Sequence, residues 1–222
     1  MLSNNKSLPY FIVIALGAFG STSAIAQYEP NDNYNSFVVS FQSSKFSTPI
    51  CFGGECHEVI TGPAVVYARQ IIPNLALGLA GSQLQSSGKA TSIKSTNLSA
   101  FAQGIIGMGP SVDIGASLAV LNNTTDLCTA IPNACTSVSD TGTDVGVFGK
   151  VFLSENRALS LTLSYNSIYF QKSPDESIIG LSLVTILAKR HRLAFSVDRV
   201  RDTNGNDISG GFGFGYSYIV YY

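Results

Sequence analysis

The chain ends in the stretch Gly211-Phe212-Gly213-Phe214-Gly215-Tyr216-Ser217-Tyr218-Ile219-Val220-Tyr221-Tyr222. Its even positions carry large apolar or aromatic side chains, and its odd positions carry glycine or serine as far as Ser217. Successive side chains of a β-strand point to opposite faces. This period of two therefore predicts a strand with one aromatic face and one face of small residues.

The same alternation recurs upstream. Leu75, Leu77 and Leu79 alternate with alanine and glycine, and the stretch 159–165 alternates leucine or tyrosine with serine and threonine. Soluble sheets place more charge on their wet face, so a crowded lumen explains these small residues better than open water. We predict an all-β, antiparallel, up-and-down transmembrane barrel of about ten strands, with eight as the alternative count. The predicted strands lie at residues 34–43, 58–69, 75–86, 94–106, 111–122, 142–153, 157–170, 177–188, 191–201 and 208–222.

The connections between these segments are predicted to alternate in length, as in transmembrane barrels. Tight turns are expected near 71–74, 107–110, 154–156 and 189–190, and longer polar loops at 44–57, 87–93, 123–141, 171–176 and 202–207. Strands of roughly 10–14 residues exceed the usual 5–6 of globular sheets and suffice to cross a bilayer at a tilt. An ordinary secreted β-sandwich remains the alternative to a barrel.

The first residues predict an export signal rather than part of the fold. Lys6 supplies a positive segment, Tyr10 to Phe19 an apolar core, and Ala24-Ile25-Ala26 a cleavage site before Gln27. The chain then divides into a signal peptide, 1–26, and a barrel domain, 27–222. No later stretch of 18 or more apolar residues exists, which excludes a helical membrane protein. The net charge of −1 offers no basic field for nucleic acid.

The C-terminal stretch resembles the end of small Gram-negative outer-membrane β-barrels of the opacity or porin-like kind. There, alternating apolar or aromatic residues form a signal for assembly. The usual last residue is phenylalanine, from which Tyr222 departs while keeping an aromatic ring. The resemblance implies an outer-membrane location, contact with membrane lipid, and assembly through periplasmic chaperones and the barrel insertase. It does not select among adhesins, proteases, lipid A-modifying enzymes and small channels. The residues that match the signal are Phe214, Tyr216, Tyr218, Val220 and Tyr222.

The four cysteines fall in two close pairs, Cys51 with Cys56 and Cys128 with Cys135, each inside a predicted outer loop. An even count in an exported chain favours disulfides. We expect both pairs to close small rings at hairpin tips, with stapling of the loop preferred over a redox or metal role.

Five polar residues are predicted to face the lumen: Gln103, Asp113, Lys150, Arg192 and Asp198. Asp113 and Lys150 lie near the inner ends of neighbouring strands, so they are expected to face each other. Buried charges need partners, and small barrels fill with side chains. A structural lumen network is therefore preferred over a conduction path.

The leading functional prediction is a non-catalytic barrel whose outer loops act in structural or adhesin-like binding roles toward an unidentified extracellular ligand, with 123–141 as the contact surface. A small pore for ions or solutes is the first alternative. An outer-membrane hydrolase using His57 with Glu55, Glu58 or Asp202 is the second, although no motif fixes that geometry. No catalytic residue, metal site or cofactor is expected. The run 202–207 only superficially resembles a calcium loop and predicts a turn.

Overall fold

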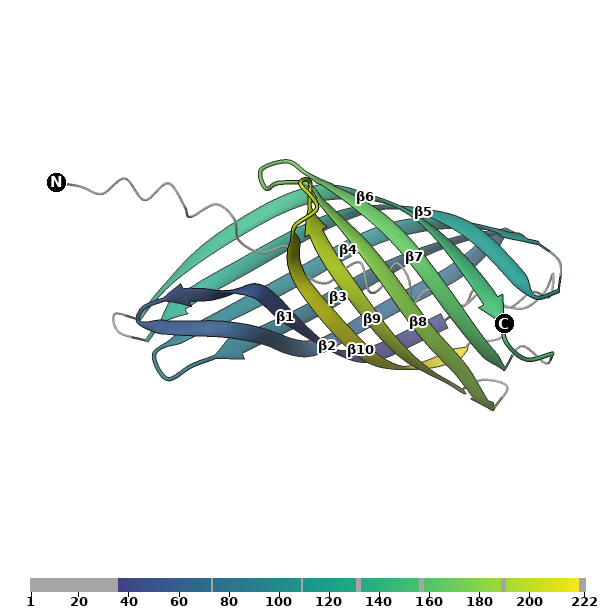
Figure 1. Cartoon of the computed structure of the whole chain (residues 1–222), viewed down its shortest axis with the longest axis horizontal. Coiled ribbons are helices and arrows are strands. Elements are labelled where there is room, and N and C mark those ends of the chain that lie inside the picture. The colour runs from purple at the N-terminus through teal and green to yellow at the C-terminus, as the bar shows by residue number, and fades with distance from the viewer. Residues whose placement is uncertain are drawn as a thin grey trace.

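A computed structural model describes residues 36–72, 74–108, 110–130, 133–155, 158–188 and 191–219. These residues form ten antiparallel strands, and pairing of the first with the last closes them into one barrel (Figure 1). The predicted signal peptide lies outside the described residues, as do Val220 and Tyr222. In the described part of the chain no helix is long and apolar enough to cross a membrane. The strands are β1 (Ser36–Phe52), β2 (Glu55–Ile72), β3 (Leu75–Ser87), β4 (Thr91–Gly107), β5 (Val112–Thr129), β6 (Ala134–Phe152), β7 (Leu159–Phe170), β8 (Glu176–Ala188), β9 (His191–Asp202) and β10 (Asp207–Ile219).

The predicted barrel of ten strands is confirmed, but two of the predicted loops are wrong. Residues 44–52 and 55–57 continue β1 and β2, which meet at a two-residue turn of Gly53 and Gly54. Residues 123–129 and 134–141 likewise continue β5 and β6. Residues 123–141 are rich in threonine, serine and asparagine, which suggested a loop. Cross-strand pairing overrides that composition because each stretch has a complementary strand directly opposite.

The two ends of the barrel therefore differ more in how far their strands extend than in the length of their connections. The loop end is defined here by the connections 53–54, 88–90, 130–133, 171–175 and 203–206, and the turn end by 73–74, 108–111, 153–158 and 189–190. The β1–β2, β3–β4 and β5–β6 hairpins reach well past the other strands at the loop end (Figure 1).

The outer surface of the wall is apolar, as the alternation predicts. Phe212, Phe214 and Tyr216 of β10 point outward, with roughly half of each side chain exposed. Leu77 and Leu79 of β3 do the same, and so do Ile179, Leu181 and Leu183 of β8. An unbroken apolar exterior on a closed sheet suits lipid, since closure leaves no unpaired edge within the membrane.

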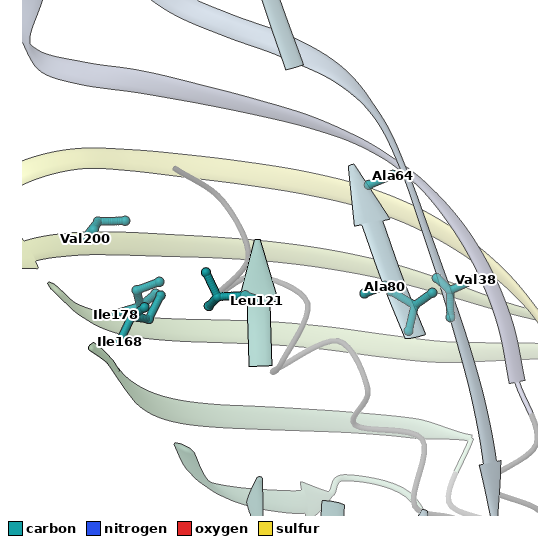
Figure 2. Packing of buried hydrophobic residues seen from close by; sticks show 8 residues of the cluster. Val38, Ala64, Ala80, Leu121, Ile168, Ile178 and Val200 are labelled. Carbon is teal, nitrogen blue, oxygen red and sulfur yellow. The ribbon is translucent and has the colours of Figure 1, made fainter. Parts of the chain in front are cut away.

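The inner surface carries small side chains and a layer of aliphatic ones. A buried cluster draws residues from seven strands into the interior (Figure 2). Glycines make room for larger neighbours: a Cβ on Gly78 would lie 2.3 Å from the ring of Phe101, and one on Gly115 would lie 2.2 Å from that of Phe148. Part of the lumen is therefore filled by protein side chains. The cluster consists of Val38, Ala64, Val66, Ala80, Leu121, Ile168, Ile178 and Val200.

Candidate functional site

The loop end has a hydrophobic core of its own, separate from the membrane wall. The outer part of the β1–β2 hairpin packs its side chains against β3, β4 and β5. A register shift between Lys45 and Ile50 marks an irregularity in the β1–β2 ladder. Such a bulge bends a strand and redirects its side chains, so it can turn the hairpin toward its neighbours. The core comprises Phe46, Ile50, Ile60, Leu84 and Ile93, with Phe52 and Leu127 packed against it.

Glu55 fastens the β1–β2 hairpin to the turn of the β3–β4 hairpin. Its carboxylate accepts hydrogen bonds from the backbone N–H groups of residues 89–91 at 2.9–3.1 Å and from the Thr91 hydroxyl at 2.7 Å. A carboxylate that collects several donors in this way forms strong, charge-assisted hydrogen bonds. We call the contact between Glu55 and residues 89–91 the Glu55 latch.

His57 continues the latch inward. Its Nε2 lies 2.8 Å from the Thr91 hydroxyl, and its Nδ1 lies 2.9 Å from the Ser86 hydroxyl. Because Thr91 donates to Glu55, its oxygen accepts from the histidine Nε2–H, which leaves Nδ1 to accept from Ser86. The ring of Phe52 stacks on the imidazole, which is only 4% exposed.

Of the three acids considered for His57 from sequence, only Glu55 is joined to it, through Thr91. Glu58 lies on the opposite, exposed face of β2. Asp202 instead binds its own turn, accepting from Asn204 and Asn206. The described residues hold no group of three or more His, Cys, Asp or Glu that could bind a metal ion.

Two disulfides close the hairpin tips, Cys51 to Cys56 and Cys128 to Cys135, as expected from the sequence. Each joins residues that are direct register partners. The described residues include no free cysteine. The covalent links therefore hold the register at the ends of the two hairpins where fraying would begin.

The β5–β6 hairpin extends past β7, whose pairing with β6 begins only at Gly142. Its base is secured by Asp140, whose carboxylate accepts from the backbone N–H groups of Lys172 at 3.2 Å and Ser173 at 2.6 Å. Burial acts to raise the pKa of Asp140, but its hydrogen bonds to Ser173, Lys172 and Thr141 outweigh burial and hold the pKa below its ordinary value.

The predicted lumen residues lie at two heights along the barrel. Asp113 and Lys150 are direct register partners, both buried, near the turn end. Gln103 and Arg192 are also buried toward that end. Asp198 lies further toward the loop end between Gly180 and Gly211, where a Cβ on Gly211 would come within 2.9 Å of its carboxylate. Phe214, Tyr216 and Tyr218, the described part of the predicted C-terminal signal, lie on β10 and pair with β9 and β1.

Sequence reasoning missed two polar contacts. Asn166 of β7 donates to both carboxylate oxygens of Asp144 on β6, at 2.8 and 3.0 Å, inside the barrel. The parity of the alternation places both residues on the inner face, so that signal was present. The Glu55 latch had no such signal, because it joins segments distant in sequence that were both predicted as loops, 44–57 and 87–93.

No protein-family model matches the chain, and no curated protein matches it in sequence. Solved structures do. The translocator domain of the autotransporter NalP from Neisseria meningitidis is 13% identical, with a TM-score of 0.53 over 92% of this chain and 94% of that one. An outer membrane channel from Pseudomonas putida F1 is 7% identical, with a TM-score of 0.50 over 84% of this chain and 95% of that one. The attachment invasion locus protein Ail of Yersinia pestis is 10% identical, with a TM-score of 0.42 over 83% and 97%.

These likenesses concern the fold. A closed antiparallel barrel with an apolar exterior, similar in fold to solved barrels of Gram-negative outer membranes, defines the class of this protein. The chain is an outer-membrane β-barrel.

Proposed function

We propose that this barrel is a non-catalytic surface protein whose loop end faces the cell exterior and binds there through its extended hairpins. Residues 1–26 direct export, and periplasmic chaperones and the barrel insertase then assemble the domain. The turn end, where the described barrel residues begin and end, faces the periplasm in this arrangement, as short turns do in such barrels.

The proposal rests on one observation: the strands at the loop end extend further than closure of the barrel requires. Three hairpins extend past the remaining strands, and they are held by a hydrophobic core, the Glu55 latch and two disulfides. Rigid elements that present a surface to water are typical of binding sites, because less ordering entropy is lost on binding.

The geometry around His57 supports a structural role over hydrolysis. The contact between the Ser86 hydroxyl and His57 Nδ1 is of the kind that a nucleophilic serine makes with its general base. However, the second nitrogen is bound to Thr91, and the imidazole is buried under Phe52. These contacts suit a side chain that fastens two hairpins together better than one that must reach a substrate.

The second candidate is a small pore, favoured by the inner face of β7 to β10. That arc consists largely of serine and glycine, whose small side chains leave space. The apolar cluster from seven strands opposes it, because it narrows the path for water and ions. The small residues of the arc are Ser160, Thr162, Ser164, Gly180, Ser182, Ser196, Ser209, Gly211, Gly213, Gly215 and Ser217, and the same face also carries the larger buried side chains Ile168, Glu176, Ile178, Arg192 and Val200.

The test compares the full chain with a variant in which residues 126–137 are replaced by Asn-Gly. This change joins the register partners Thr125 and Val138 by a hairpin turn. Bacteria that display the wild-type chain are expected to adhere to cultured epithelial cells at least several-fold better than bacteria that display the variant. The purified protein is expected to be silent in planar bilayers. Stable conductance steps, with adherence equal for both chains, would establish the pore instead.

A further inference from the structure

The sheet has two open edges at the loop end. β1 pairs with β10 only as far as Phe46, and β6 pairs with β7 only from Gly142 onward. In the described part of the chain, residues 47–52 and 134–141 therefore have a strand on one side only. Such an edge presents unpaired N–H and C=O groups to any other extended chain, and proteins usually protect it.

The β1 edge is protected in the usual ways. An exposed Lys45 precedes it, Pro49 lies within it and removes a donor, and its ladder with β2 shifts register between Lys45 and Ile50. Positive charge, proline and bulges each oppose the addition of another strand.

From residue 134 to residue 138 the β6 edge carries none of these protections, and beyond them the positively charged Lys172 ammonium group lies at the Ser139 carbonyl. Residues 134–139 are Ala-Cys-Thr-Ser-Val-Ser, without charge, proline or glycine. All six are exposed, and their register with β5 is unbroken. They lie beyond the end of β7, at the loop end of the barrel. A long, flat and neutral edge of this kind favours pairing with a further strand.

The disulfide fixes which backbone groups point outward. The Cα atoms of Cys128 and Cys135 are 4.1 Å apart, the separation of a non-hydrogen-bonded antiparallel pair rather than the ~5.5 Å of a hydrogen-bonded one. The N–H and C=O of Cys135 therefore point away from β5, and so do those of Ser137 and Ser139. The Lys172 ammonium group donates to the Ser139 carbonyl from that same open side, at 3.0 Å.

Among the residues that the structure describes, no strand pairs with the N–H and C=O of Cys135, the N–H and C=O of Ser137, or the N–H of Ser139. We propose that these groups bind an extended segment of another polypeptide, which adds to the barrel as a strand beside β6. The proposal rests on the proposed binding function and specifies its mode. Main-chain hydrogen bonds supply the affinity in this mode, and side chains at alternate positions supply selectivity.

Three contacts hold the β6 edge in the extended conformation that such a segment would bind. The disulfide locks its tip, Ser137 donates a short hydrogen bond to Asp126 across the hairpin, and Thr124 donates to Ser139 at 3.2 Å. The neutral small side chains of 134–139 fit a neutral segment better than a charged one. A second copy in the same membrane fits poorly, because both β6 strands would run in the same direction and could meet only in parallel.

The probe is a library of random linear dodecapeptides on phage, selected on the full protein in nanodiscs against empty nanodiscs. Enriched peptides are measured on wild type, Ser137→Pro and Ser137→Ala. Both variants lose the hydroxyl contact to Asp126, but only proline also removes the outward N–H and crowds the edge, while the ladder to β5 stays intact. We expect at least a tenfold loss of affinity for Ser137→Pro and less than a twofold loss for Ser137→Ala.

A second measurement needs only the wild-type protein. N-methylation of every other amide of an enriched peptide is expected to abolish binding, whereas methylation of the intervening amides is tolerated. Failure to enrich peptides, equal affinity for Ser137→Pro, or tolerance of methylation throughout overturns the proposal. Clustering of protein-bearing vesicles that Ser137→Pro abolishes would identify a second copy in a facing membrane as the occupant and overturn it as well. If Ser137→Pro adheres normally while the 126–137 replacement does not, the edge fails and the binding function stands.

Discussion

At the scale of single residues, Glu55 shows how one side chain can order a surface. The Thr91 hydroxyl, and with it the N–H groups of residues 89–91, holds the pKa of Glu55 below its ordinary 4.5. A lowered carboxylate pKa means that the folded state favours the ionised form. The stabilising contribution is therefore complete above about pH 4.5 and is lost as the pH falls through the lower folded-state pKa.

Glu55→Gln is expected to speed hydrogen exchange at the amides of 89–91 at pH 7, because the amide side chain replaces one acceptor oxygen by a donor. In a pH series below 4.5 the wild type is expected to show the same faster exchange once the pH falls through the lowered pKa of Glu55, after correction for the intrinsic rate. Mass spectrometry of the protein in detergent micelles measures both. Glu58→Gln, on the exposed face of the same strand, is the control and should leave 89–91 unchanged. Equal exchange in all three chains would contradict the latch.

At the scale of the secondary-structure elements, the β5–β6 hairpin is a long ribbon that its own strands cannot stabilise alone. An isolated two-stranded hairpin is marginal in water. In its outer half β5 is paired with β4 as far as Thr129, but β6 is paired with β5 alone, so β6 depends there on that ladder, the disulfide, cross-strand side chains and Asp140 at its base. The outer part of β6 can fray without opening the barrel wall, because β6 pairs with β7 only from Gly142 onward.

Replacing both Cys128 and Cys135 by serine is expected to remove about 2–3 kcal/mol of chain-entropy stabilisation from this hairpin. Cleavage by subtilisin between residues 129 and 136 should become several-fold faster, as mass spectrometry of the fragments would show. The heat-induced mobility shift of the barrel on gels should not change. The matched control, serine at Cys51 and Cys56, should leave the β5–β6 hairpin as resistant as in the wild type. A lowered barrel transition would show that the hairpin supports the wall after all.

At the scale of the whole molecule, the stability of the barrel depends on the side chains that fill its lumen. Asp113 and Lys150 are buried partners on adjacent strands near the turn end, and the Lys150 ammonium lies 4.8 Å from the centre of the Phe152 ring. A charge pair in such a place contributes little net stability, but removal of one member is costly because the other is left buried.

Lys150→Ala is therefore expected to destabilise the folded barrel by about 3–5 kcal/mol, seen as a lower temperature of the mobility shift in detergent. The double variant Lys150→Met with Asp113→Asn should recover part of this loss, because it removes both charges. An unchanged transition for Lys150→Ala, or no recovery in the double variant, would show that the two residues do not act as a pair.

The sequence by itself determined the wall of this protein. A period of two fixes which side chains face lipid and which face the lumen, so the strand count, the outward position of Phe214 and the inward position of Asp113 follow from local pattern. The close spacing of Cys51 with Cys56 and of Cys128 with Cys135 likewise indicated hairpin tips.

Only the tertiary structure decided the shape of the loop end. Residues 123–129 and 134–141 have the composition of loops, and they become strands because each finds its partner across the hairpin. The Glu55 latch, the buried His57 and the open edge of β6 depend on which strands end early and which continue, and no local pattern encodes that. Contacts between segments distant in sequence set those endpoints, which is why the wall of the barrel was readable from the sequence while the shape of its loop end was not.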